Sequence, residues 1–145
     1  MQDSPVIKYH FSLGHQVKDI EKIEHTIKEL ESIWDIDEKS LFQLNLVLEE
    51  LISNTMFYGF LGMEEGSIDV DLSFDGSYIN VIIQDNAKAF DPTVEAKDTS
   101  GHSLDERAIG GLGIMLSQRI SEEMNYQRHG DLNKLSFKIN TKRND

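Results

Sequence analysis

An Asp-Gly pair at residues 75 and 76 separates two strand-like segments, and it restricts the fold of this chain more than any other feature. Apolar and polar residues alternate before it over residues 68–74, and residues 78–84 after it are strand-like with a mostly apolar middle. Asp-Gly between two such segments is the strongest short-range signal for a β-hairpin. We therefore predict a hairpin whose apolar second strand lies in the centre of a sheet.

Two amphipathic helices are predicted upstream of the hairpin. The first extends from about residue 17 to residue 34, because apolar residues return there at helical spacing. These apolar residues are Ile20, Ile23, Ile27, Leu30 and either Ile33 or Trp34. Asp37 then offers an N-cap for a second helix over about residues 38–60, which is expected to stop near Gly59 or Gly62.

The remaining segments add three strands and a third helix. Strand-like alternation covers residues 6–13, and a closing hairpin is predicted from residues 124–128 and 135–140. The third helix is predicted over about residues 112–122. It follows a polar loop over about residues 91–110, and a loop of that length inside a compact domain is typical of a functional lid or a disordered segment.

Taken together, these elements predict an α+β fold. Residues 1–145 are expected to form one domain, because this length suits a single domain with its own core. The predicted architecture is a two-layer sandwich with about five strands in a mostly antiparallel mixed sheet and three helices on one face.

Composition narrows the classes of function. The net charge of −12 disfavours direct binding to nucleic acid or anionic lipid, because phosphates would be repelled. An acidic surface is compatible either with a basic protein partner or with solubility alone. The chain has no cysteine, which excludes disulfides and thiolate metal sites. Neither a membrane span nor a signal peptide is expected from the distribution of apolar residues.

Two polar stripes mark the second predicted helix. Asn45, Glu49 and Ser53 form one stripe, which can face solvent. Glu50 and Asn54 form another, beside the apolar face. Such groups cost free energy at a buried margin unless they are paired or bind a ligand. They are compatible with a simple Glu–Asn hydrogen bond, or with oxygen donors for a hydrated Mg²⁺ beside a carboxylate that accepts a proton.

Asp85 stands at the end of the apolar central strand. A lone carboxylate there is costly unless it holds a donor, and the exocyclic amino group of adenine is such a donor. The alternative is a turn aspartate, which is common where a strand ends.

A run of glycines, Gly110-Gly111-Leu112-Gly113, precedes the third predicted helix. Glycines ahead of a helix N-terminus leave N–H groups bare and let a ligand approach the main chain, which suits a phosphate. A flexible joint without a ligand is the competing interpretation.

These three constellations, in this order, resemble the GHKL (Bergerat-fold) ATPases, and within them the bacterial anti-sigma regulatory factor branch of serine protein kinases. Residues 50–59 are similar to the pattern E-x-x-x-N-x-x-x-H/Y-G, and residues 85–92 are similar to D-x-G-x-x-F-D-P. Residues 110–114 resemble the G-G-L-G-I motif that precedes the E-V-x-Y and N-x-L motifs of this branch. Those last two motifs are matched by Glu123-Met124-Asn125-Tyr126 and Asn133-Lys134-Leu135.

The resemblance implies a role for each matching residue. Asn54 corresponds to the Mg²⁺-coordinating asparagine, Glu50 to the general base toward an acceptor serine, and Asp85 to the aspartate that binds adenine. The implied nucleotide-binding set also includes Ala87, Phe90, Gly111, Leu112 and Gly113. Arg107, the only arginine in the predicted lid loop, is the candidate contact to the γ-phosphate.

The resemblance also implies ATP and Mg²⁺ as cofactors, and a cytoplasmic kinase that phosphorylates a serine on an anti-anti-sigma (STAS-type) partner and sequesters a sigma factor. Homodimers are common in the branch, and neither direct nucleic-acid binding nor membrane binding is expected. Ala87 stands where glycine is usual and adds one methyl group near adenine. Two alternatives stay open: a nucleotide-gated binding module without phosphoryl transfer, and a scaffold without nucleotide.

Overall fold

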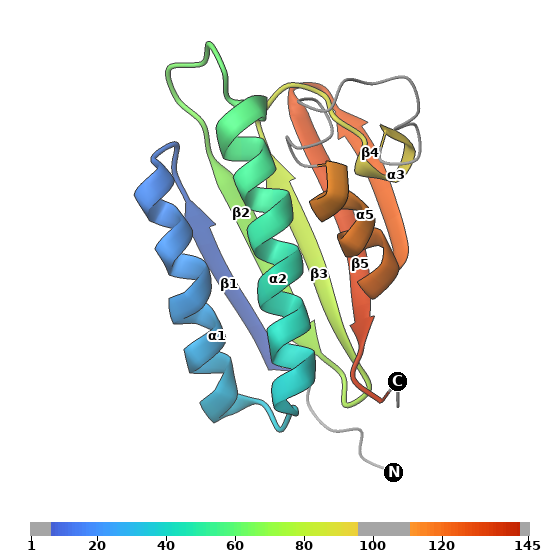
Figure 1. Cartoon of the computed structure of the whole chain (residues 1–145). Helices are drawn as coiled ribbons and strands as arrows, with labels where there is room; N and C mark the ends of the chain where they lie inside the picture. Colours follow the sequence, from blue (N-terminus) through green and yellow to red (C-terminus); the bar gives the residue numbers. More distant parts are fainter. Residues whose placement is uncertain (1–6, 96–110, 143–145) are drawn as a thin grey trace.

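The computed structural model describes residues 7–95 and 111–142 of the chain. One layer is a five-stranded sheet, and the helices cover one of its faces (Figure 1). The strands are β1 (Ile7–Leu13), β2 (Ile68–Phe74), β3 (Tyr78–Asp85), β4 (Glu122–His129) and β5 (Leu132–Asn140). The predicted α+β two-layer sandwich is therefore confirmed.

The sheet has the strand order β1-β2-β3-β5-β4, and each of its four described strand pairs is antiparallel. The described sheet thus lacks the parallel pairing that a mixed sheet would contain. Strand β3 lies in the middle, as its apolar sequence predicts. Its inward side chains Ile79, Val81 and Ile83 are buried beneath the helices.

The predicted hairpin joins β2 to β3. Gly76 has a φ of +98°, a conformation that glycine adopts without the strain a Cβ would bring. The Asp75 carboxylate accepts hydrogen bonds from the backbone N–H groups of Tyr78 (2.8 Å) and Ser77 (2.9 Å). These two hydrogen bonds lower the pKa of Asp75. The turn is therefore closed by its own side chain, within four residues of sequence.

The first predicted helix begins as a short 3₁₀ turn, η1 (Val17–Ile20), and continues as α1 (Glu21–Ile33). From the sequence, either Ile33 or Trp34 could be the last apolar residue of this helix to pack in the core. Trp34 is 3% exposed and packs in the core, whereas Ile33 is 42% exposed. The core contact therefore belongs to the residue just after the helix.

The second predicted helix is α2 (Glu38–Asn54), and Asp37 caps it by accepting a hydrogen bond from the Ser40 backbone N–H. The predicted last turn is wound differently, because residues Thr55–Gly59 form the π-helical turn η2. Such π turns occur frequently at functional sites. Helix α2 crosses the middle of the sheet, between α1 and α5 (Figure 1).

Two helices follow β3 within residues 7–95 and 111–142. The four-residue helix α3 (Pro92–Glu95) lies inside the segment predicted as a lid loop, so that prediction is wrong for these residues, and residues 96–110 lie outside the described part. Helix α5 (Gly111–Ile120) matches the third predicted helix to within two residues at each end. Across the described residues, every helix is too short or too polar to cross a membrane.

Candidate functional site

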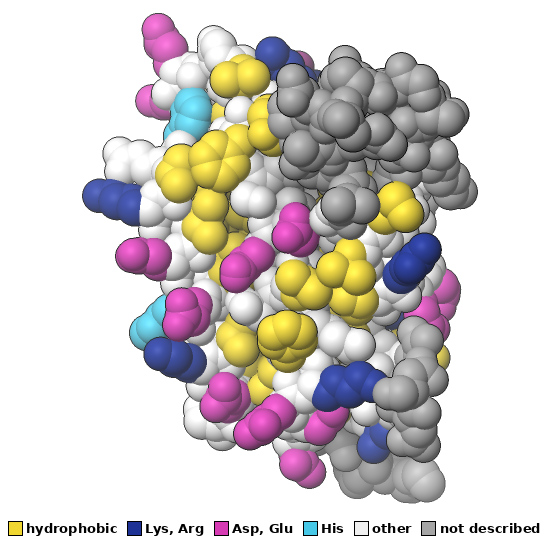
Figure 2. All heavy atoms as spheres, viewed as in Figure 1, with side chains coloured by type: hydrophobic (Ala, Val, Ile, Leu, Met, Phe, Trp, Pro, Cys, Tyr) yellow, Lys and Arg dark blue, Asp and Glu magenta, His cyan; other side chains and the backbone are white. Residues whose placement is uncertain are grey.

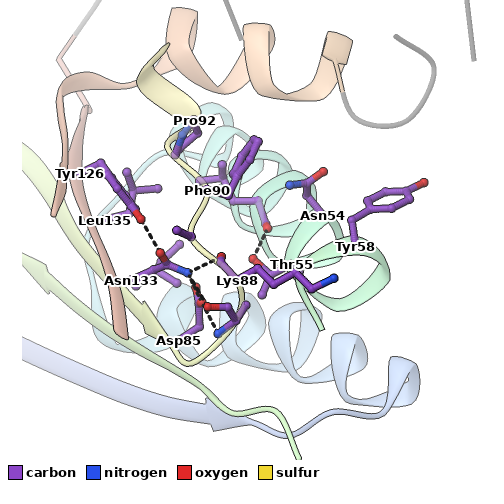
Figure 3. Close-up of a pocket in the computed structure, with 15 residues that line it drawn as sticks. Asn54, Thr55, Tyr58, Asp85, Lys88, Phe90, Pro92, Tyr126, Asn133 and Leu135 are labelled. Atoms are coloured by element: carbon purple, nitrogen blue, oxygen red, sulfur yellow. Dashed lines mark hydrogen bonds between the residues drawn. The ribbon is translucent and has the colours of Figure 1, made fainter. Parts of the chain in front are cut away.

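A pocket of about 390 Å³ lies where the end of β3 meets the C-terminal end of α2 (Figure 3). Its lining includes four of the predicted site residues: Asn54, Asp85, Ala87 and Phe90. The other walls come from η2, from the loop after β3 and from the β4–β5 hairpin. The fold thus brings together two motifs that are about 30 residues apart in the chain.

Asp85 lies at the bottom of this pocket and is only 8% exposed. Burial raises the pKa of its carboxyl group, and hydrogen bonds from Asn133 and Ala87, together with the Arg128 charge, partly offset that rise. Both hydrogen bonds reach the same oxygen: Oδ1 accepts from Asn133 Nδ2 at 2.8 Å and from the Ala87 N–H at 3.0 Å. The hydrogen bond from the Ala87 N–H is typical of a turn aspartate, which was the alternative role predicted for Asp85 from the sequence. Within the described residues, Oδ2 stays available for a donor on a ligand.

Ala87 packs against η2. A Cβ atom built on Gly59 would lie 2.9 Å from the Ala87 Cβ, and the Lys88 N–H donates to the Gly59 carbonyl at 3.2 Å. The methyl group that distinguishes Ala87 from the usual glycine is therefore accommodated because Gly59 has no side chain. Gly59 cannot take a side chain without moving the loop.

Asn54 projects from the last turn of α2 at the wall of the pocket (Figure 3). It is half-buried, and its side chain has no hydrogen-bond partner among the described residues, so the Glu50–Asn54 hydrogen bond considered from the sequence does not form. Mg²⁺ typically takes only one or two protein oxygens and completes its shell with water and phosphate. A free carboxamide oxygen beside the pocket fits that requirement.

Glu50 lies one turn before Asn54 and faces α5 instead of lining the pocket. A Cβ atom built on Gly113 would lie 1.9 Å from Glu50 Oε2 and 2.6 Å from its Cδ. Only glycine at position 113 therefore leaves room for the Glu50 carboxylate in this position. Gly113, which the resemblance predicts as a phosphate contact, therefore also determines where the carboxylate of the predicted general base can lie.

Glu49 points elsewhere, as the 100° step between adjacent helix residues requires. The Asn45 Nδ2 group donates to Glu49 Oε1 at 3.5 Å. The predicted separation of the two glutamates onto different faces is thus observed. The stripe with Asn45 is only half-exposed, however, and Asn45 Oδ1 is buried without a partner in the described residues. The stripe therefore faces solvent only in part, since Asn45 buries its carboxamide oxygen.

Two predicted nucleotide contacts, Gly111 and Leu112, belong to the first turn of α5. Gly113 follows them in the same turn. Arg107 lies outside the described residues. The structure therefore gathers Asn54, Asp85, Ala87 and Phe90 around the pocket, with the Glu50–Gly113 contact next to it.

Sequence reasoning gave no role to three residues of the β4–β5 hairpin. Asn133 and Tyr126 line the pocket, and Arg128 donates from Nη1 to the Ala87 carbonyl at 2.9 Å. Asn133 and Tyr126 stand in the closing motifs that carried the family resemblance. The motif alone could not show that Asn133 pairs directly with Asp85 across β3 and β5.

The family model of the histidine kinase-like ATPase domain matches residues 15–139 of this chain. The chain belongs to that family. The match includes the pocket and both helices beside it, so the predicted GHKL membership of this histidine kinase-like ATPase domain is confirmed.

Several relatives of this domain are named as kinases. It is 28% identical over 96 residues to the serine/threonine-protein kinase BtrW of Bordetella bronchiseptica, covering 66% of this chain and 68% of BtrW. It is 26% identical over 90 residues to the serine-protein kinase RsbW of Listeria innocua, covering 59% and 57%. A putative sensor histidine kinase NtrY-like protein of Rickettsia typhi is 35% identical over 81 residues, but these cover only 13% of that protein.

A solved structure shares the fold. The crystal structure of the RsbU and RsbW domains of Rv1364c from Mycobacterium tuberculosis superposes with a TM-score of 0.62 over 94% of this chain and 33% of that one. The sequence identity is 10%, so this likeness supports the fold alone.

Proposed function

We propose that this domain binds ATP with Mg²⁺ and transfers the γ-phosphoryl group to a serine of an anti-anti-sigma (STAS-type) protein, and that it also sequesters a sigma factor. The observation that carries the nucleotide part is the buried Asp85 carboxylate, with one oxygen open to the pocket. The kinase part is supported by relatives named serine kinases. A test is to incubate the protein with labelled ATP and STAS proteins encoded beside it, and absence of transfer would favour a nucleotide-gated binding module.

In the proposed site, Asp85 Oδ2 accepts a hydrogen bond from the adenine amino group and Phe90 lines the wall beside the base. Asn54 provides an oxygen for Mg²⁺, which when bound neutralises charge on the phosphates. The first turn of α5 contains Gly111 and Gly113 and contacts Glu50. Phosphates bound at this turn would therefore lie beside the proposed general base, Glu50. This arrangement follows the general rule that phosphoryl transfer depends mainly on positioning and charge neutralisation.

The proposed reaction is an in-line displacement. The serine hydroxyl oxygen attacks the γ-phosphorus, the bond from that phosphorus to the β,γ-bridging oxygen breaks, and ADP departs. Glu50 takes the hydroxyl proton. The position of its carboxylate, one helical turn before Asn54 and against Gly113 of α5, supports this role.

The partner proposals draw on the surface of the helical layer. Figure 2 shows acidic side chains interspersed with apolar ones on this face. Phe42 on α2 is 65% exposed and Leu116 on α5 is 41% exposed. Such a surface suits a protein partner with apolar and basic groups.

We also propose a homodimer, which sedimentation would detect. The regular edge strand β1 supports it, whereas edge strand β4 carries a bulge between Glu122 and Asn125.

Asp85→Asn is expected to weaken ATP binding by roughly 1–3 kcal/mol, because the amide lacks the charge and presents a donor in one orientation. The unliganded variant should be at least as stable as the wild type at neutral pH. Folding raises the pKa of Asp85, so the wild type loses stability as the pH rises from the ordinary value of 3.8 through the raised value. Asparagine has no such loss, and its Oδ1 still accepts from Asn133 and Ala87.

Calorimetry with ATP and thermal unfolding from acid to neutral pH measure the two effects of Asp85→Asn. GTP, which has a carbonyl in place of the amino group, should bind the wild type poorly. Equal competition by GTP and ATP would show that Asp85 does not distinguish adenine from guanine.

Gly113→Ala is expected to slow phosphoryl transfer by about 10²-fold, because displacement of a catalytic group by about 1 Å can cost that much. The new Cβ must move the Glu50 carboxylate, which is the free end of a flexible side chain. The free energy of unfolding should hardly fall, since alanine favours a helix by up to about 1 kcal/mol over glycine. Single-turnover transfer assays and thermal unfolding measure both quantities, and full activity in a folded variant would refute the steric role.

A further inference from the structure

Asn133 lies in β5 directly opposite Asp85 in β3, and it is 6% exposed. It does not merely fill space, because both ends of its amide make hydrogen bonds (Figure 3). A buried carboxamide with all its groups satisfied is strongly oriented by its surroundings.

The surroundings of Asn133 allow one orientation of the amide. On one side, Arg128 Nη1 donates to Asn133 Oδ1 at 3.0 Å, and the Tyr126 hydroxyl donates to the same oxygen. A guanidinium can only donate, so the amide oxygen must face it. The Asn133 Nδ2 group therefore has to point the other way.

Three hydrogen-bond acceptors lie on the Nδ2 side of the Asn133 amide. Asn133 Nδ2 lies 2.8 Å from Asp85 Oδ1, 2.9 Å from the Lys88 carbonyl and 3.3 Å from the Ala87 carbonyl. The same amide thus holds the Asp85 carboxylate and the loop that forms the wall of the pocket. Its distance from Asp85 Oδ1 is that of a charge-assisted hydrogen bond.

The charge of Arg128 partly offsets the rise that burial causes in the pKa of Asp85, but the hydrogen bonds of Arg128 Nη1 go to the loop after β3 and to this amide. Its Nη1 atom binds the Ala87 carbonyl and Asn133 Oδ1, and in the described part of the chain no ion pair joins Arg128 directly to Asp85. Asn133 therefore lies between the cation and the buried carboxylate. Without the amide, the Ala87 N–H would be the one partner left to Asp85 Oδ1 among the residues that the structure describes.

We propose that Asn133 is a positioning residue that sets the base selectivity of the pocket without touching the base. By occupying Asp85 Oδ1 it leaves Oδ2 as the acceptor that a ligand meets, and it holds the carboxylate in one rotamer against the loop. A base with an exocyclic amino group satisfies Oδ2, whereas a base with a carbonyl there leaves the carboxylate unpaired. This inference rests on the proposed ATP site.

The test compares ATP with inosine triphosphate, which differs in having a carbonyl in place of the adenine amino group. Calorimetry in excess Mg²⁺ measures both affinities for the wild type and for Asn133→Ala. We expect the ratio of ATP to inosine triphosphate affinity to fall by about tenfold or more, while the affinity for inosine triphosphate changes little. A purely structural role would lower both affinities by the same factor, and that result would overturn the proposal.

Two further variants keep the test decisive. Asn133→Leu has a similarly branched side chain and loses the donor toward Asp85 without adding a second carboxyl group beside it, so it replaces Asn133→Ala if that variant does not fold. Asn125→Leu makes the same chemical change at an exposed position of β4 and should retain the wild-type ratio. In an Asp85→Asn background, Asn133→Ala should reduce the ratio no further, because both changes act through one carboxylate.

The outcomes separate this inference from the function on which it rests. A wild type that binds neither nucleotide overturns the proposed ATP site and this inference with it. If the wild type binds ATP and inosine triphosphate equally well, Asp85 does not select the base. A selective wild type whose selectivity survives in the Asn133 variants leaves the ATP site standing and refutes only the role of Asn133.

Discussion

Glu50→Gln is expected to lose phosphoryl transfer by about 10²–10⁴-fold while ATP binding stays close to that of the wild type. Glutamine keeps the shape of the side chain but cannot accept the serine proton. The side chain lies against Gly113 and does not line the pocket, so removal of its charge should disturb the bound nucleotide little. Transfer of labelled phosphate to a STAS partner and calorimetry with ATP measure the two properties separately.

Glu49→Gln is the matched control, since Glu49 is the neighbouring residue and undergoes the same chemical change. Its carboxylate pairs with Asn45 on another face of α2, so transfer should be almost unaffected. If Glu49→Gln were the inactive variant and Glu50→Gln the active one, the assignment of the general base would be wrong.

Asn54→Ala is expected to abolish the part of ATP affinity that depends on Mg²⁺. The Asn54 side chain has no hydrogen-bond partner among the described residues, so its loss should cost the unliganded protein little stability. A coordinating oxygen, by contrast, is lost outright from a shell to which the protein contributes only one or two. Calorimetry with ATP in excess Mg²⁺ and in excess chelator measures the difference that should disappear.

Ser53→Ala provides the control for Asn54→Ala. Ser53 is the adjacent residue, and its hydroxyl donates to the Glu50 carbonyl within the same helix at 3.3 Å. This variant should keep the Mg²⁺ dependence of the wild type. Unchanged ATP affinity of Asn54→Ala in excess Mg²⁺ would exclude Asn54 as a metal ligand.

Much of this protein could be predicted because the relevant interactions are local in sequence. The Asp75-Gly76 turn is closed by hydrogen bonds within four residues, and the separation of Glu49 from Glu50 follows from helix geometry. The π turn at Thr55–Gly59 escaped prediction, since the apolar pattern of a helix does not distinguish its winding.

The sequence by itself determined the five strands, the three longer helices α1, α2 and α5, and the motifs that identify the family, because periodicity and turn chemistry act over a few residues. Only the tertiary structure decided which distant residues meet. Asn133 lies opposite Asp85, 48 residues earlier, because β5 pairs with β3. Gly113 lies against Glu50 because α5 packs beside α2. Strand order and helix packing bury apolar surface across the whole domain, so no local pattern records which polar groups they bring together.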